Sequence, residues 1–393
     1  MPAPQTYQFK NLVQSDGSVL SPAFVTVQQG RFTRVASTAE TTPITDYKNA
    51  TALPGFTNAH CHLELTALGP LPEQRFVPWI IELVRQKHKL ANNNMQAGII
   101  KGCRELLRSG VVRVFDHISP ETPATVFENL PLKVRGFVEI LGSHKERSLK
   151  SWQQGKEFCA SAPLPSHLTL HSGHTVHPDV KNAFIKEQNR LLSIHLAECE
   201  SENELVQTQQ GEFAEFILKT NPEITKAELS NGSSALQILW EQNAFSNSLI
   251  VHGNHLSDND IKLIAKHKDL CVVHCPNSYA FFDHGGFDFE RLQQEGIPVA
   301  LGTDGLVSNT ELNMLGEIQS FLKTHPKTDL ATLMPMITLN AAKALGLADE
   351  GDVKESYKAD LVLMHNTENL EPLQLLKQKN QVDQVMLNGQ WVI

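Results

Sequence analysis

Between residues 51 and 302, short runs of β-branched and apolar residues alternate with longer segments of helical periodicity. The short runs predict eight strands, at Thr51–His60, Val111–His117, Val134–Leu141, Leu168–Ser172, Leu191–His195, Leu249–His252, Cys271–His274 and Val299–Gly302. The intervening segments predict helices, among them Phe76–Leu90, Gln96–Ser109 and Asn203–Lys219. Strands that alternate with helices favour a parallel sheet, and closing eight of them into a barrel removes both sheet edges. We therefore predict an α/β fold with a (β/α)8 TIM-like barrel over residues 51–350.

The two ends of the chain carry a different pattern. The first 50 residues contain short alternating runs broken by Asp-Gly and Gln-Gly, and residues 351–393 again contain short strand-like runs with an Asn-Gly turn. Such turns are typical of β-hairpins. A barrel takes roughly 250 residues, so a chain of this length has room for a second module. We expect residues 1–50 and 351–393 to form one small β-domain beside the catalytic barrel.

Composition and charge narrow the kinds of partner. The chain of 393 residues is 41% hydrophobic and 20% charged, as in ordinary globular proteins. Its formal net charge of −9 and the lack of a Lys/Arg-rich run argue against nucleic acid, whose binding begins with phosphate neutralisation. The sequence predicts neither a membrane span nor a signal peptide. We expect a cytoplasmic protein that acts on a small molecule, and a homodimer is among the oligomeric states that the sequence leaves open.

Candidate chemistry lies at the ends of the predicted strands, which share one face of a parallel barrel. His60 and His62 close the first strand, and a spacing of two places both imidazoles on the same side of an extended chain. His195 and His252 end the fifth and sixth strands, and Asp304 follows the eighth. Imidazole and carboxylate ligands suit zinc or iron(II), and a site with few protein ligands keeps a position open for water. These residues predict a metal site at the strand ends.

The motifs that carry these residues resemble the amidohydrolase superfamily, in its branch of adenosine, S-adenosylhomocysteine and chlorotriazine-type deaminases and hydrolases. The resemblance runs through PGFTNAHCH, HLAE, HCPNS, GTDG and SNTELNMLGE, and through KADLVL and LNGQWV near the C-terminus. It implies one divalent ion, zinc first and iron or manganese as alternatives, held by His60, His62, His195 and Asp304. It also implies that Glu198 is the proton shuttle and that His252 and Asp304 assist the hydrolytic water.

The resemblance also indicates the reaction. Binuclear members carry a bridging carbamylated lysine at the end of a middle strand, and the predicted strands Val134–Leu141 and Leu168–Ser172 offer no such lysine. A mononuclear site follows. A bound ion lowers the pKa of water toward neutrality, and Glu198 can pass a proton to the ring nitrogen beside C6 of an adenine and then assist the loss of ammonia. We therefore expect a hydrolytic deaminase.

The segments NAHCHLELTALG, FVPWI and HCPNSYAFFDHGGFDFERL are similar to those of aminofutalosine deaminases of the menaquinone route. The similarity implies 6-amino-6-deoxyfutalosine as the first candidate substrate, followed by adenosine, 5′-methylthioadenosine and S-adenosylhomocysteine. The candidate substrate-binding residues are Glu64, Trp79, Arg135 and His174, although Trp79 is equally consistent with a helix core and Arg135 with a solvent-facing pair. Val176 and His177 depart from the related stretch around His174. Val77 lies where adenosine-type members present an acidic residue for the ribose hydroxyls, so ribose recognition must differ or come from elsewhere.

Two other readings stay open at this point. The same metal site could act on a different ring, as in a triazine- or guanine-type amino- or chlorohydrolase. A non-catalytic barrel that binds a ligand or serves as a scaffold is disfavoured, because neither Glu198 nor any of the four metal-ligand positions is missing from the sequence.

Overall fold

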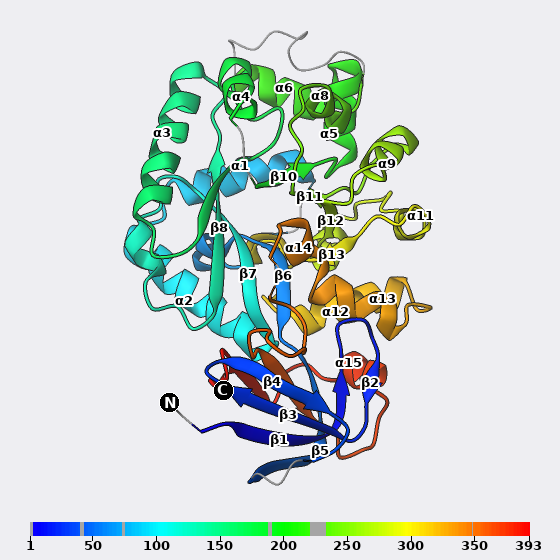
Figure 1. Cartoon of the computed structure of the whole chain (residues 1–393). Helices are drawn as coiled ribbons and strands as arrows, with labels where there is room; N and C mark the ends of the chain where they lie inside the picture. The colour runs from blue at the N-terminus through cyan, green and yellow to red at the C-terminus, as the bar shows by residue number, and fades with distance from the viewer. Residues whose placement is uncertain (1–2, 40–42, 73–74, 188–190, 221–232, 348) are drawn as a thin grey trace.

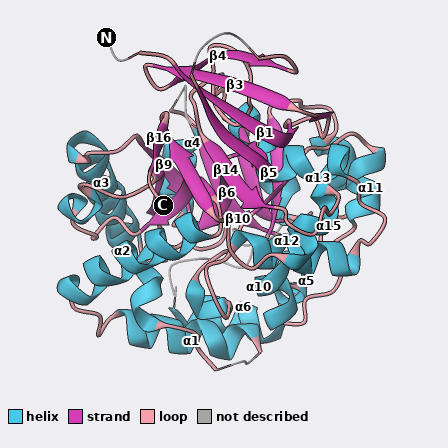
Figure 2. Cartoon of the chain, turned by 90° about the horizontal axis from the view of Figure 1, so that it is seen from below, coloured by secondary structure: helices cyan, strands magenta, loops and turns pink. Residues whose placement is uncertain are grey.

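The computed structural model describes residues 3–393 apart from 40–42, 73–74, 188–190, 221–232 and 348. The described chain has a mixed α/β fold, and Figure 2 shows helices around a central set of strands. Two four-stranded parallel sheets carry the middle of the chain, in the orders β6-β7-β8-β9 and β10-β11-β12-β13. Their strands are β6 (Phe56–Cys61), β7 (Val111–Ile118), β8 (Lys133–Ile140), β9 (Ser166–Leu170), β10 (Leu192–Leu196), β11 (Ser248–His252), β12 (Leu270–His274) and β13 (Val299–Leu301).

The two parallel sheets meet along both of their outer edges. At the seam between β6 and β13, the His60 carbonyl accepts hydrogen bonds from the backbone N–H groups of Thr303 and Asp304, each at 3.1 Å. At the seam between β9 and β10, the backbone N–H of His195 donates to the carbonyl of His171 at 3.0 Å. The carboxyl ends of strands from both sheets are therefore joined by backbone hydrogen bonds at these two seams.

Strands from both ends of the chain join in a third sheet, which lies below the parallel sheets in Figure 1. Its order is β16-β15-β14-β5-β1-β3-β4, with β2 beside β1; only β1 and β5 pair in parallel among the pairs described. Tyr7, Phe9, Phe32, Leu361 and Met386 belong to a separate buried cluster on this sheet. The strands are β1 (Gln5–Val13), β2 (Val19–Leu20), β3 (Ala23–Gln28), β4 (Arg31–Ala36), β5 (Ile44–Pro54), β14 (Leu361–His365), β15 (Gln384–Leu387) and β16 (Gln390–Trp391).

The predicted first strand, Thr51–His60, is divided between two sheets. Residues up to Pro54 belong to β5 in the terminal sheet, and β6 begins at Phe56 in the first parallel sheet. Gly55 separates them, and a Cβ atom at this position would lie 2.5 Å from the Val112 side chain. A side chain would not fit there, and the terminal sheet extends past the boundary expected at residue 50.

Helices connect the strands of the parallel sheets. The prediction of one helix over Asn203–Lys219 is wrong, because α5 ends at Thr208 and α6 begins at Gly211. Gln209 between them has a φ of 59°, and this left-handed conformation ends the helical hydrogen-bond ladder. No helix in the described ranges has the length and apolar character needed to cross a bilayer. The helices are α1 (Phe76–Lys87), α2 (Asn92–Arg108), α3 (Lys145–Ser161), α4 (Pro178–Ile185), α5 (Glu200–Thr208), α6 (Gly211–Thr220), α8 (Ala235–Glu241), α9 (Asp258–Ile264), α10 (Pro276–Phe281), α11 (Phe289–Gln294), α12 (Met314–Thr324), α13 (Leu330–Ile337), α14 (Asn340–Ala344) and α15 (Pro372–Gln378).

Candidate active site

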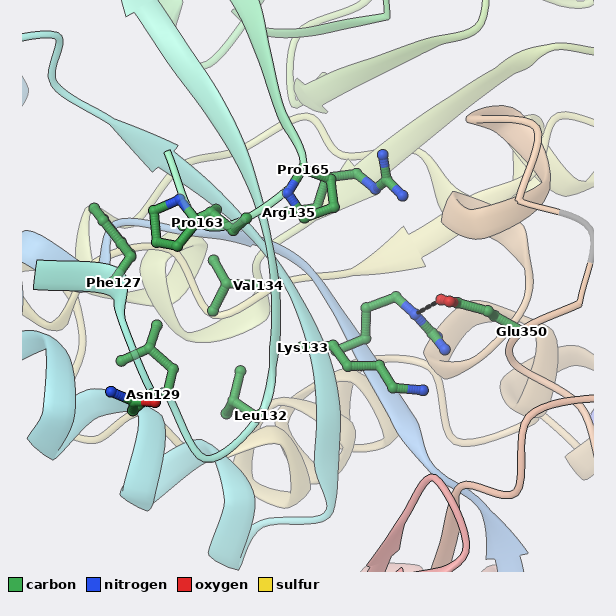
Figure 3. A pocket seen from close by; sticks show the side chains of 12 residues that line it. Phe127, Asn129, Leu132, Lys133, Val134, Arg135, Pro163, Pro165 and Glu350 are labelled. Atoms are coloured by element: carbon green, nitrogen blue, oxygen red, sulfur yellow. Dashed lines mark hydrogen bonds and ion pairs between the residues drawn. The ribbon is translucent and has the colours of Figure 1, made fainter. Parts of the chain in front are cut away.

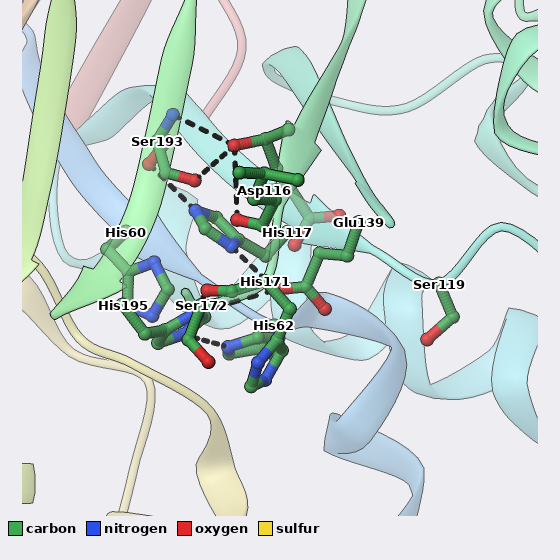
Figure 4. A network of polar contacts seen from close by, with 12 residues as sticks. His60, His62, Asp116, His117, Ser119, Glu139, His171, Ser172, Ser193 and His195 are labelled. Atoms are coloured by element: carbon green, nitrogen blue, oxygen red, sulfur yellow. Dashed lines mark hydrogen bonds and ion pairs between the residues drawn. The ribbon is translucent and has the colours of Figure 1, made fainter. Parts of the chain in front are cut away.

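Histidines from the two parallel sheets converge at the carboxyl ends of their strands (Figure 4). The Nε2 atoms of His62 and His195 lie 3.2 Å apart. The Oδ1 atom of Asp304 lies 3.4 Å from His60 Nε2 and 3.8 Å from His62 Nε2. The structure thus brings together the four residues that the sequence analysis assigned to a metal ion.

The donor set of this cluster fits a divalent cation. His60 is fully buried, and neither of its ring nitrogens has a hydrogen-bond partner among the described residues. Burial lowers the pKa of His60 and of His195, which favours the neutral imidazoles that metal binding requires. His195 Nδ1 lies 3.0 Å from the His171 carbonyl, so it carries the proton and leaves the Nε2 lone pair toward the cluster. Unpartnered buried nitrogens beside a carboxylate are the groups that a cation would satisfy.

Two serine hydroxyls orient the carboxylate of Asp304. Ser278 Oγ donates to Asp304 Oδ2 at 2.7 Å, and Ser308 Oγ donates to the same oxygen at 2.8 Å. The other oxygen, Oδ1, is then left to face the histidines. Ser278 lies in the HCPNS motif, so the sequence contained the signal although no role followed from it.

His117 is a member of the cluster that the sequence reasoning missed. Ligand atoms of His60, His62, His117 and His195 all lie within 4.8 Å of one another. Both ring nitrogens of His117 are engaged, however, because Nδ1 lies 2.9 Å from Glu139 Oε1 and Nε2 lies 2.8 Å from Ser193 Oγ. This hydrogen bonding favours a supporting position over metal ligation. The available signal was that His117 ends a predicted strand, as His195 does.

Glu139 connects His117 to the rest of the cluster. Its Oε1 atom lies 3.6 Å from His195 Nδ1, and Glu139, His171 and His195 form a second group with ligand atoms within 4.8 Å of one another. Figure 4 shows these side chains side by side, with Ser193 on the far side of His117. The carboxylate therefore lies behind the histidines and can fix their orientation.

Glu198 and His252 lie together, with 3.6 Å between Glu198 Oε1 and His252 Nε2. Burial, followed by the nearby charges of Asp304 and Glu202, raises the pKa of Glu198 well above its usual range. Burial lowers the pKa of His252 well below its usual range. The Glu198 backbone is fixed from two sides, because its N–H donates to Glu202 Oε2 at 2.8 Å and its carbonyl accepts from Asn254 Nδ2 at 2.9 Å. A buried carboxyl group whose pKa is raised thus lies beside a buried imidazole whose pKa is lowered.

His174, a predicted substrate-binding residue, is linked to this acid through Glu202. Its Nδ1 atom is 3.7 Å from Glu202 Oε1, and Glu202 in turn holds the Glu198 backbone. The side chain is largely buried and contacts Phe213 edge to face, with 5.1 Å between ring centroids. Burial lowers the pKa of His174 to about 3, so the ring is neutral near pH 7.

Glu64 and Trp79 are committed to contacts within the protein. The buried Glu64 carboxylate accepts from Thr122 Oγ1 at 2.6 Å and from Ser119 Oγ at 2.5 Å, and pairs with Lys87 Nζ at 2.7 Å. Trp79 is 7% exposed, and its indole N–H donates to the Val307 carbonyl at 3.3 Å. These contacts place Trp79 in a hydrophobic cluster, the alternative that the sequence also allowed.

Arg135 is not brought to the histidine cluster. It is the third residue of β8, whose carboxyl end carries Glu139, and so lies toward the opposite end of the strand. There it lines a separate cavity, and its Nη1 atom lies 3.0 Å from His167 Nε2.

Comparisons with known proteins cover nearly the whole chain. The model of the Amidohydrolase family matches residues 51–392. An aminodeoxyfutalosine deaminase from a Nitratiruptor species is 27% identical over 342 residues, which cover 82% of this chain and 81% of that protein. An adenosine deaminase from Helicobacter pylori is 28% identical over 363 residues, with 88% of each chain covered. The crystal structure of Helicobacter pylori aminofutalosine deaminase in complex with methylthio-coformycin aligns with a TM-score of 0.87 and 24% identity, over 99% of this chain and 100% of that one. This last likeness shows a shared fold.

Proposed function

This chain belongs to the amidohydrolase family, and from that premise we propose that it is a metal-dependent hydrolytic deaminase of 6-aminopurine nucleosides. One observation carries the proposal: the cluster of three histidines and Asp304 lies in the same site as the buried carboxyl group of Glu198, which contacts His252. Metal-type ligands alone indicate only that water is activated. A proton donor beside them is what the departure of ammonia from a ring carbon requires.

The relatives support a ranking of substrates. Relatives that match more than four-fifths of the chain are named aminodeoxyfutalosine deaminase, adenosine deaminase, 5-methylthioadenosine/S-adenosylhomocysteine deaminase and 5′-deoxyadenosine deaminase. We place 6-amino-6-deoxyfutalosine first, and adenosine, 5′-methylthioadenosine and S-adenosylhomocysteine next. Among the candidates for substrate contact we favour His174, because it lies beside Glu202.

We propose that one divalent ion, with zinc as the first candidate, is held by His60, His62, His195 and Asp304. Such an ion lowers the pKa of a water molecule and so supplies hydroxide near neutral pH. The remaining chemistry belongs to the side chains. Glu198 Oε1 can collect a proton from the water and deliver it to the ring nitrogen of the substrate, and His252 Nε2 can accept a hydrogen bond from the attacking water. The two serine hydroxyls on Asp304 Oδ2 keep Oδ1 directed at the site.

We also propose that the two parallel sheets form one (β/α)8 barrel and that the terminal sheet is a small β-domain beside it. The backbone hydrogen bonds at both seams support the barrel. The separate buried cluster on the terminal sheet supports the second domain. In this division the catalytic barrel begins at Phe56, where β6 starts, and ends near residue 350.

Ammonia release from a panel of nucleosides and heterocycles tests the function. We expect the highest kcat/KM with a 6-aminopurine nucleoside, and a loss of about 10²–10⁴-fold in kcat for Glu198→Gln with unchanged metal content. The exposed neighbour Glu200 provides a control, since Glu200→Gln makes the same substitution outside the site. Unchanged turnover in Glu198→Gln would contradict the proton role, activity on triazines or guanine alone would favour the alternative hydrolases, and an active metal-free preparation would contradict the metal site.

A further inference from the structure

A cavity of about 360 Å³ lies at the amino ends of β7 and β8 (Figure 3), away from the carboxyl ends that carry the histidines. One wall is apolar and comes from two segments of chain, with Phe127, Leu130, Leu132, Val134, Pro163, Leu164 and Pro165. The other end is cationic and carries Arg113, Lys133 and Arg135. A cavity of this size, with apolar walls and a few polar groups at one end, is typical of small-molecule sites.

Positive charge exceeds negative charge around this cavity. The lining residues and their ion-pair partners comprise four cationic and two anionic side chains: Arg113, Lys133, Arg135, Lys358, Glu350 and Asp360. Lys133 pairs with Asp360 at 2.6 Å, Lys358 pairs with Glu350 at 2.5 Å, and Arg113 contacts both carboxylates. Four positive and two negative groups leave two positive charges unbalanced.

The excess charge is located on the two arginines. Arg113 is only 2% exposed, and its Nη2 atom has no hydrogen-bond partner among the described residues, with Asp360 Oδ2 at 3.6 Å. Arg135 forms no ion pair with a carboxylate in the described ranges; its guanidinium contacts the ring of His167 at 3.0 Å. Burial, followed by the charge of Arg135, lowers the pKa of His167, which favours a neutral ring that can accept a hydrogen bond but cannot serve as a counter-ion. A partly buried guanidinium without a counter-ion is unfavourable, and an anion would correct it.

We propose that this cavity binds a small organic anion, a carboxylate or phosphate monoester attached to an apolar ring or chain. The planar guanidinium groups of Arg135 and Arg113 match the oxygens of such an anion, and the apolar wall near Phe127 receives the remainder. The site is distinct from the proposed active site and does not depend on the proposed function.

A substitution of Arg135 can test ligand binding without removing the ion pairs that support the fold. The ion pairs of Arg113 with Glu350 and Asp360 join β7 to the segment that precedes β14, so their loss would weaken the fold. Arg135 takes no part in them. Arg135→Gln therefore removes a cation from the cavity while the ion pairs remain, and Arg104→Gln, at an exposed position of α2, is the matched control.

Isothermal titration calorimetry of the full-length, metal-loaded protein with phenyl phosphate, benzoate and inorganic phosphate tests the site. We expect one equivalent of phenyl phosphate or benzoate to bind, and the stronger of the two identifies the anionic group. Arg135→Gln should weaken that binding about tenfold or more, because charge-assisted hydrogen bonds are lost, whereas Arg104→Gln should bind as the native protein does. The ligand-free melting temperature of Arg135→Gln should equal that of the native protein.

Several results would overturn the proposal. The first is that neither organic anion shows saturable binding. The second is that Arg135→Gln and the native protein bind the anion with equal affinity, because the anion would then be bound elsewhere, for example at the metal site. Inorganic phosphate that binds as tightly as phenyl phosphate would overturn the organic-anion assignment in favour of free phosphate. A lowered ligand-free melting temperature in Arg135→Gln would show that Arg135 supports the fold instead.

Discussion

Replacement of Ser278 by alanine tests how the carboxylate of Asp304 is held. The change removes one of two hydroxyl donors to Asp304 Oδ2, the bond at 2.7 Å, and leaves the Ser308 bond at 2.8 Å. A hydrogen bond to a charged group contributes about 1.5–3 kcal/mol, and each 1.4 kcal/mol corresponds to about a factor of ten. Because Ser308 still donates, we expect the lower end of this range, a loss of about tenfold in metal affinity. Ser278→Ala combined with Ser308→Ala should lose at least a further factor of about ten.

The assay is competition between the protein and a chromophoric chelator for zinc, with kcat/KM for adenosine measured in parallel. Ser161 provides a control, because it lies exposed at the end of α3 and, within the part of the chain that the structure describes, its hydroxyl donates only to carbonyls of that helix. Ser161→Ala should bind zinc as the native protein does. Unchanged zinc affinity in both the single and the double variant would refute the reasoning, since Asp304 would then need no donors to bind the ion.

Three further predictions concern stability. Gly302→Ala should lower the free energy of unfolding, measured in urea, by about 1–3 kcal/mol, because the new Cβ would lie 2.9 Å from the His60 backbone nitrogen. Gly285 has open space around it, so Gly285→Ala should lower this free energy by less. Equal effects of the two substitutions would contradict the prediction. Burial raises the pKa of Glu317 from 4.5 to about 8, so the stability that this group contributes is complete below pH 4.5 and is lost as the pH rises toward 8. Urea titrations across that range should show Glu317→Gln gaining on the native protein by up to about 1.4 kcal/mol per pH unit, and parallel curves would refute the shift. Treatment with a chelator should lower the melting temperature and added zinc should restore it, since an ion that binds only the folded chain stabilises it; an unchanged melting curve would argue against a bound ion.

The sequence predicted the parallel strands from Val111 onward to within two residues of their limits. These strands are buried along most of their length, so their apolar runs stand out from the amphipathic helices between them. The division at Gly55 could not be predicted in this way. The run from Thr51 to His60 contains the pair Pro54-Gly55, which marks a break but does not tell which sheet each part joins. The side chain of Val112, from another strand, explains why position 55 is a glycine.

The residues of the histidine cluster could likewise be predicted only in part. The spacing of His60 and His62 and the motifs around His195 and Asp304 carry local information, and the structure brings these side chains together. His117 lies in no motif, and its position follows only from its hydrogen bonds to Glu139 and Ser193, which come from other strands. Pairwise contacts of this kind leave little trace in a single sequence.

The proposed metal site can form only after β6 and β13 have come together. His60 and Asp304 adjoin there, and the nearby hydrogen bond between the side chains of Asn58 and Thr303, at 2.8 Å, links residues 245 positions apart. Contacts so distant along the chain form only after a large loop has closed, which is slow and entropically costly. A chain still under synthesis can present at most the three histidines of the set until Asp304 has emerged. Full metal affinity therefore reports the completion of folding, and a nascent or truncated chain would bind the ion weakly.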